Sequence, residues 1–113
     1  MIVFETETQI MNLKPNFNVL QTLDCRGVIA TAKGNDCDFV SRFFAPRFGI
    51  NEDPVTGSAH CLLTPYWAKK LNREKLKAKQ ISKRGGELEC ELKHDRVFIT
   101  GNAVKYLEGV IVI

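Results

Sequence analysis

The longest regular pattern of hydrophobic positions lies in the middle of the chain, over residues 58–71. Apolar side chains recur there at helical spacing, at Ala59, Leu62, Leu63, Tyr66 and Trp67. Cys61, Ala68 and Leu71 widen the apolar surface, so the sequence predicts a helix that is buried around most of its circumference. Pro65 lies inside the segment and removes one backbone hydrogen bond, which favours a kink.

Shorter stretches on both sides of this helix have the pattern of strands separated by turns. Alternation is clearest over residues 87–92, where Leu88, Cys90 and Leu92 share one face. Strands are predicted over residues 2–5, 28–32, 39–44, 76–82, 87–92, 96–100, 104–107 and 110–113, and a further helix from near Pro15 to just before Gly27. This order predicts a β-rich α+β domain built around one buried helix.

The composition changes this picture little. A chain of 113 residues with 44% apolar and 26% charged residues is ordinary for one globular domain. No secretory signal is visible near the N-terminus, and the longest aliphatic run, residues 110–113, is far too short to cross a bilayer. The expected location is therefore the cytoplasm. Predicted strands reach almost to both ends, which is consistent with a piece of a longer architecture.

Positive charge is concentrated in the segment that follows the central helix. Eight of the sixteen basic residues fall there, namely Lys69, Lys70, Arg73, Lys75, Lys77, Lys79, Lys83 and Arg84. One interpretation is attraction of an anionic small molecule or a nucleic acid. The other is a solvated helix end followed by an edge strand protected by lysines. No aromatic residue interleaves the charges to stack on bases, so we expect the second and no nucleic-acid partner.

The four cysteines, at positions 25, 37, 61 and 90, form no Cys-x-x-Cys pair and no metal-binding spacing with His60 or His94. We expect free thiols and no metal site. Cys90 has the position of a small buried hydrophobe on a strand. Cys61 is of more interest because it directly follows the strongest motif of the chain.

That motif is GINEDPVTGSAHC, residues 49–61, which leads a loop onto the start of the central helix. Free backbone N–H groups and the positive end of the helix dipole favour a negative group at such a start. Gly57 removes a side chain where a ligand carboxylate would approach the backbone. Ser58 or Thr56 is placed to cap the helix or to donate to that ligand. Asp53, slightly outside, is placed to hold an ammonium group or to handle a proton.

A purely structural interpretation explains the same letters. Aspartate and serine are common capping residues before an apolar run, and Asp-Pro and Thr-Gly are common turn dipeptides. Pattern alone leaves the two interpretations open.

The string EDPVTGSAHC, with RFFAP and GI before it and PYWA after it, closely resembles the phenazine-biosynthesis-like (PhzF-type) isomerases. The segments QISKRGGEL and RVFITGNAV resemble later strands of that family, so the likeness spans about residues 20–110. It implies a diaminopimelate-epimerase-like fold with two similar halves, each a β-barrel around a central helix, and an active site between them. The whole chain, residues 1–113, would then be one domain equivalent to the C-terminal half, a barrel-like sheet around one helix.

The resemblance also implies roles for residues. It implies a cofactor-independent isomerase that moves a hydrogen within a small amino- and carboxy-substituted substrate. The family's second-half acid falls on Asp53, and the pair that holds the substrate carboxylate falls on Gly57 and Ser58. Related racemases carry a catalytic thiol at this turn; here Cys61 lies inside the helix, which disfavours thiol-based epimerisation.

Residues after the central helix offer two further interpretations. Gln80, Ser82 and Arg84 alternate along one predicted strand and either line the same cleft or make ordinary strand hydrogen bonds with a solvent-facing arginine.

One part of the family pattern is missing from this chain. The family's general base, a glutamate, and a Gly-His carboxylate clamp come from the first half, and Glu5, Glu7 and Glu52 do not lie in that motif context. The leading hypothesis is therefore one wall of an isomerase site, inactive alone, completed by a homodimer partner or a separate first-half chain. The alternatives are a non-catalytic homodimeric binding or scaffold domain left by truncation, and a weak nucleic-acid binder with salt-dependent affinity.

Overall fold

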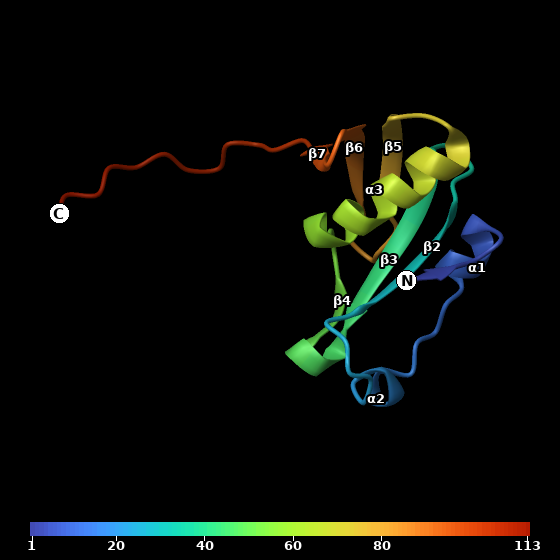
Figure 1. Ribbon diagram of the computed structural model, residues 1–113. Coiled ribbons are helices and arrows are strands. Elements are labelled where there is room, and N and C mark those ends of the chain that lie inside the picture. The colour runs from blue at the N-terminus through green and yellow to red at the C-terminus, as the bar shows by residue number, and fades with distance from the viewer.

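The computed structural model describes residues 1–113, which form an open mixed sheet with helices on both of its faces (Figure 1). The elements are β1 (Ile2–Val3), α1 (Glu7–Met11), α2 (Phe17–Leu20), β2 (Val28–Lys33), β3 (Phe39–Ala45), a 3-10 helix η1 (Pro46–Phe48), β4 (Ile50–Asp53), α3 (Gly57–Leu71), β5 (Lys75–Gln80), β6 (Gly86–Lys93) and β7 (Arg96–Thr100). The predicted α+β class is confirmed.

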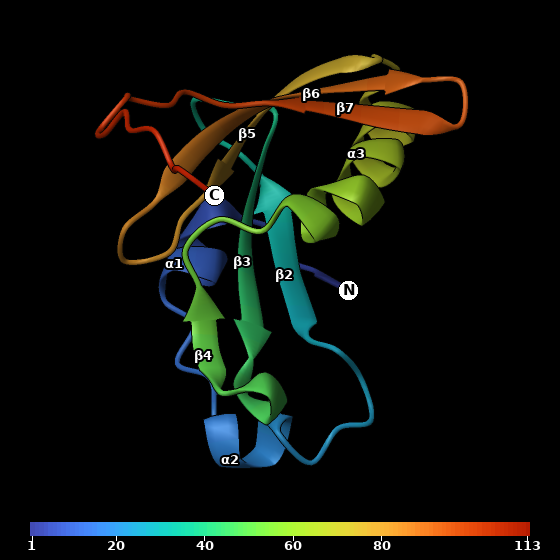
Figure 2. The ribbon, with the colours of Figure 1, turned by 90° about the vertical axis from the view of Figure 1, so that its left-hand side faces the viewer.

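The sheet contains seven strands in the order β1-β2-β3-β5-β6-β7, with β4 paired to β3 outside this path. β2 and β3 form an antiparallel pair, and β3 and β5 are parallel neighbours joined through β4 and α3. Figure 2 shows β4 beside β3, with α3 following it across the sheet. β4 leads directly into α3 through residues 54–56, here called the motif loop. The motif loop therefore lies where an edge of the sheet meets the start of the central helix.

Both faces of the β2–β3 pair are buried. Ile29 and Phe39 face α3, where Phe39 and Trp67 stack with ring centroids 5.8 Å apart. Alternate residues such as Ala30 and Val40 face the other way, toward α1 and α2. The buried Trp67 indole N–H donates to the Thr31 hydroxyl at 3.0 Å, so the central helix is fixed to β2 by a polar contact as well as by packing.

α3 runs unbroken through Pro65, but it is less enclosed than its composition predicted. The sheet is not closed into a barrel, and it covers one side of the helix only. Leu62 is 63% exposed, and Cys61 and Pro65 are exposed beside it. An apolar stripe on the central helix therefore faces solvent.

The predicted strands over residues 104–107 and 110–113 do not form. Residues 101–113 have no regular structure and extend away from the domain (Figure 1). Their apolar side chains are almost fully exposed, at Val104, Tyr106, Leu107, Val110, Ile111, Val112 and Ile113. A strand needs a neighbouring edge to pair its backbone groups, and this segment pairs with no strand of the chain.

The N-terminal third also differs from the prediction. The helix predicted from Pro15 to Gly27 is confined to α2. A short helix that the periodicity did not reveal, α1, begins with a capping box in which Thr6 and Gln9 exchange hydrogen bonds. β4 was interpreted as loop, because four residues are too few for a clear alternation.

The lysines after α3 lie on an inner strand, so the predicted edge strand is wrong. β5 pairs with both β3 and β6, and Lys75, Lys77 and Lys79 stand opposite glutamates of β6. Lys75 approaches Glu91 to 3.6 Å and Lys79 approaches Glu87 to 3.3 Å. These cross-strand pairs neutralise much of the positive charge. No helix of the chain has the length and apolar character needed to span a bilayer.

Candidate functional site

The four predicted site residues lie together where β4 ends and α3 begins. Gly49 allows the turn before β4 with φ of 79°, a conformation that favours glycine. β4 then pairs with β3, with Asp53 opposite Phe43. Three residues further on, Thr56 is the N-cap residue of α3, and Gly57 and Ser58 lie in its first turn.

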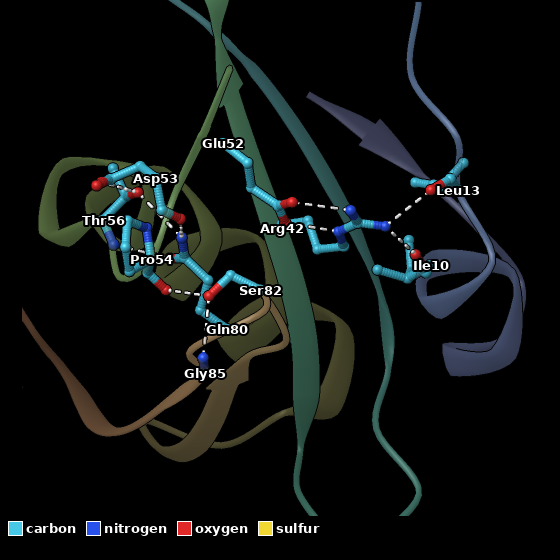
Figure 3. A network of polar contacts seen from close by, with 10 residues as sticks. All are labelled: Ile10, Leu13, Arg42, Glu52, Asp53, Pro54, Thr56, Gln80, Ser82 and Gly85. Carbon is cyan, nitrogen blue, oxygen red and sulfur yellow. Dashed lines mark hydrogen bonds and ion pairs between the residues drawn. The ribbon is translucent and has the colours of Figure 1, made fainter. Parts of the chain in front are cut away.

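Glu52 and Asp53 are neighbours in sequence but point to different partners (Figure 3). The Arg42 guanidinium donates to both carboxylate oxygens of Glu52, at 2.7 and 2.9 Å. A third nitrogen of Arg42 donates to the carbonyls of Ile10 and Leu13, at 3.1 and 3.0 Å. These contacts fix β4 to β3 and to the end of α1. Both carboxylate oxygens of Glu52 are used by Arg42, on the face of β4 opposite to Asp53.

Asp53 is half-buried and is held by Thr56. The Thr56 hydroxyl donates to Asp53 Oδ2 at 2.5 Å. The other carboxylate oxygen, Oδ1, accepts no hydrogen bond from the chain. Asp53 therefore has one oxygen fixed by the protein and one free for a ligand proton or an ammonium group.

Gln80 joins Asp53 and Thr56 from the end of β5 (Figure 3). Its side chain is buried, and its oxygen accepts from the Thr56 backbone N–H at 2.8 Å. Its amide nitrogen donates to the Asp53 carbonyl at 2.7 Å and to the Thr56 hydroxyl at 3.1 Å. Gln80 thus supports the motif loop from beneath instead of lining an open cleft.

Ser82, two residues after Gln80, supports the same loop at Pro54. Its hydroxyl donates to the Pro54 carbonyl at 2.8 Å and accepts from the Gly85 N–H at 3.0 Å. Val55 packs so closely on Gly86 that a methyl group there would lie 2.3 Å from it. Of the three alternating residues, Gln80 and Ser82 make structural hydrogen bonds and Arg84 is exposed.

The start of α3 is open. Thr56 makes no side-chain cap, and the N–H groups of Gly57, Ser58 and Ala59 have no acceptor within the chain. Gly57 and Ser58 are exposed, and no atom lies within 4 Å of the place where a Gly57 side chain would begin. Three free amides and the positive helix end favour a small anion at this position.

His60 fixes this first turn from inside the core. The fully buried ring places Nδ1 2.8 Å from the Thr56 carbonyl, so Nδ1 carries the proton and donates it. Burial lowers the pKa of His60, and its Nε2 has no partner. The sequence suggested only a test of His60 as a metal ligand, and its spacing of four residues from Thr56 was the one signal of this structural role.

The cysteines lie outside this network. Cys90 is buried, as its alternation predicted, and burial raises its pKa. Cys61 is exposed on α3, one turn after Gly57.

Comparisons with known proteins agree with these features. The sequence model of the family described as "Phenazine biosynthesis-like protein" matches residues 1–109. An uncharacterized isomerase of Pseudomonas aeruginosa is 53% identical over 109 residues, which are 96% of this chain and 42% of that protein. The mouse phenazine biosynthesis-like domain-containing protein 1 is 46% identical over 112 residues, 93% of this chain and 39% of that protein.

Solved structures show the same relationship. A PhzF family protein of Enterococcus faecalis superposes with a TM-score of 0.84 at 52% identity, covering 86% of this chain and 38% of that one. A putative PhzC/PhzF protein of Clostridium difficile gives a TM-score of 0.87 at 48% identity, covering 98% of this chain and 43% of that one. The chain thus spans about two-fifths of the length of the relatives it matches. With the family's motif loop formed at the start of α3, the chain belongs to the phenazine biosynthesis-like protein family.

Proposed function

We propose that this domain supplies one wall of a cofactor-independent isomerase site for a small amino- and carboxy-substituted molecule. The observation that carries the proposal is the combination at one loop of an open helix start and a carboxylate with one free oxygen. The relatives named isomerases support the reaction class.

In this proposal the substrate carboxylate binds the N–H groups of Gly57 and Ser58. Exposed amides at a helix start interact with an anion through hydrogen bonds and through the helix dipole. The open space at Gly57 lets the carboxylate approach the backbone, and Ser58 adds a hydroxyl donor.

Asp53 handles the proton or holds the amino group through Oδ1. General acid–base catalysis requires the group within hydrogen-bond reach of the reacting atom. Thr56 contributes by fixing Oδ2, and it leaves Oδ1 turned to the ligand.

A hydrogen shift also needs a base on the other side of the reacting carbon. Glu52, the nearest carboxylate in sequence, is occupied by Arg42. We therefore propose that a separate first-half chain supplies the base, and that this chain without it is inactive, also as a homodimer. The alternative, a non-catalytic homodimeric binding domain, uses the same helix start without turnover.

A titration monitored by backbone amide NMR tests the proposal, with benzoate as the probe and benzamide as the uncharged control. We expect benzoate to shift the Gly57, Ser58 and Ala59 signals saturably, because only the anion benefits from the free amides. Gly57→Ala should weaken this binding without unfolding, since the added methyl group meets open space in the chain but blocks the anion. Gly101→Ala, equally unobstructed, is the matched control.

The same samples should show no exchange of substrate hydrogen for solvent deuterium in amino-carboxylates. Absence of benzoate shifts at residues 57–59, or equal shifts with benzamide, would contradict the carboxylate site. Exchange that is robust and lost in Asp53→Asn would show that the chain already contains its base.

A further inference from the structure

Thr56 occupies the position of a helix cap but does not act as one. Its extended backbone, with φ of −117° and ψ of 99°, is the conformation from which a threonine hydroxyl normally accepts the N–H of the second or third helical residue. Those residues here are Ser58 and Ala59. The hydroxyl instead donates to Asp53, and the helix start stays free.

The buried amide of Gln80 explains this orientation. Its oxygen accepts from the Thr56 N–H, so its nitrogen, with two hydrogens, faces the Asp53 carbonyl and the Thr56 hydroxyl. The hydroxyl oxygen receives a hydrogen from Gln80 and gives its own hydrogen to Asp53. Both directions are thereby fixed, and successive hydrogen bonds of this kind strengthen one another.

We propose that Gln80 is a positioning residue that keeps α3 uncapped by holding the Thr56 hydroxyl against Asp53. This proposal rests on the proposed carboxylate site at Gly57 and Ser58. Without the Gln80 donor, the Thr56 side chain is free to rotate about its first torsion and to accept from the amide of Ser58 or Ala59. The helix then caps itself, and the cap competes with the ligand for the same N–H groups.

Wild-type protein gives the first measurement. Amide hydrogen exchange should be fast at Ser58 and Ala59 and slow at Thr56, whose N–H is bonded to the buried Gln80 oxygen. Slow exchange at Ser58 and Ala59 would overturn the proposal, because it would mean that these amides are already paired.

Gln80→Met gives the second measurement, since methionine has similar length and volume but no donor and no charge. We expect slower exchange at Ser58 or Ala59 and roughly tenfold weaker benzoate binding, the size expected for an N-cap side chain competing with the ligand. Gln80→Leu serves if the methionine variant does not fold. Ser82→Ala is the matched control, because it removes a hydrogen bond to the same loop at Pro54 but leaves Thr56 untouched.

Rescue separates self-capping from simple disorder of the loop. Adding Thr56→Val to Gln80→Met removes the competing hydroxyl, so benzoate affinity should rise again above that of Gln80→Met. If affinity falls further, Gln80 acts only as structural support and the proposal is wrong. If wild type does not bind benzoate, the carboxylate site itself fails; if wild type and Gln80→Met bind equally, only the role of Gln80 fails.

Discussion

Every polar group of Thr56 is bound by another part of the chain. Its N–H donates to Gln80, its carbonyl accepts from His60, and its hydroxyl lies between Gln80 and Asp53. A residue held from three directions has little freedom, so the loop keeps its shape although the next two residues are exposed. His60 is the member of this set whose charge changes near neutral pH.

His60 should make stability depend on pH. Burial holds its folded-state pKa below the ordinary value of about 6.5, so the unfolded chain binds the proton more readily. The free energy of unfolding should therefore keep its highest value above about pH 6.5. It should fall as the pH drops below this, by at most about 1.4 kcal/mol per pH unit. Urea denaturation between about pH 7.5 and about pH 5.5 measures this slope.

His60→Gln should flatten the slope by the contribution of one proton. His94→Gln, which changes the exposed second histidine in the turn after β6, is the matched control. Identical slopes for His60→Gln and wild type would contradict the assignment of this pH dependence to His60.

The sequence predicted the contiguous part of the site but not its support. Asp53, Thr56, Gly57 and Ser58 fall within six residues, so one loop-to-helix pattern identified them together. Gln80 lies 24 residues after Thr56. Its contact depends on the parallel register of β3 and β5, which places Ser41 beside Gln80 and which no local pattern encodes.

At the scale of elements, β4 is a weakly supported strand of the sheet. It has four residues, pairs with β3 only, and exposes Ile50. Its register also shifts between Phe43 and Ala45 of β3. The ion pair of Arg42 with Glu52 therefore fixes β4 to β3 just before Asp53, which Thr56 and Gln80 hold in turn.

Replacing Arg42 should cost stability because a lysine cannot form the two-pronged contact. The side chains of Arg42 and Glu52 are only 12% and 20% exposed, so the lost hydrogen bonds are poorly replaced by water. Arg42→Lys should lower the free energy of unfolding by about 1–3 kcal/mol in urea denaturation. Arg47→Lys, in the exposed pair with Asp24, is the matched control and should change it little. Equal effects of the two substitutions would show that the Arg42–Glu52 pair stabilises the fold no more than the exposed Arg47–Asp24 pair.

Elements with a clear period and turn residues at their ends were predictable, and the short elements and the unpaired C-terminal segment were not. α3, β5, β6 and β7 appear close to their predicted positions, because each has a clear period and turn residues at its ends. Residues 104–113 have equally strong apolar patterning but form no strand, since hydrophobicity specifies burial and does not supply the edge that a strand requires.

At the scale of the whole molecule, apolar surface is exposed in several places, two of which bear on assembly. One is the stripe of Cys61, Leu62 and Pro65 on α3, and the other is the extended segment after β7.

We predict that this chain forms a homodimer with the Asp53-to-Ser58 loops near the contact. Large exposed apolar patches on a monomer are uncommon and usually mark an interface, and a two-fold axis lets one patch cover its copy. Light scattering should give twice the chain mass at high protein concentration, and a strictly monomeric mass would contradict the prediction.

The position of the contact needs a separate measurement, for which the native thiols are suited. Cys61 is exposed one turn after Gly57, whereas Cys25 is exposed in the bend after α2. A short thiol-specific cross-linker should therefore join two copies through Cys61, so Cys61→Ser should abolish the covalent dimer and Cys25→Ser should not. The reverse result would place the contact on the α2 side, and the dimer would then leave the motif loop facing solvent.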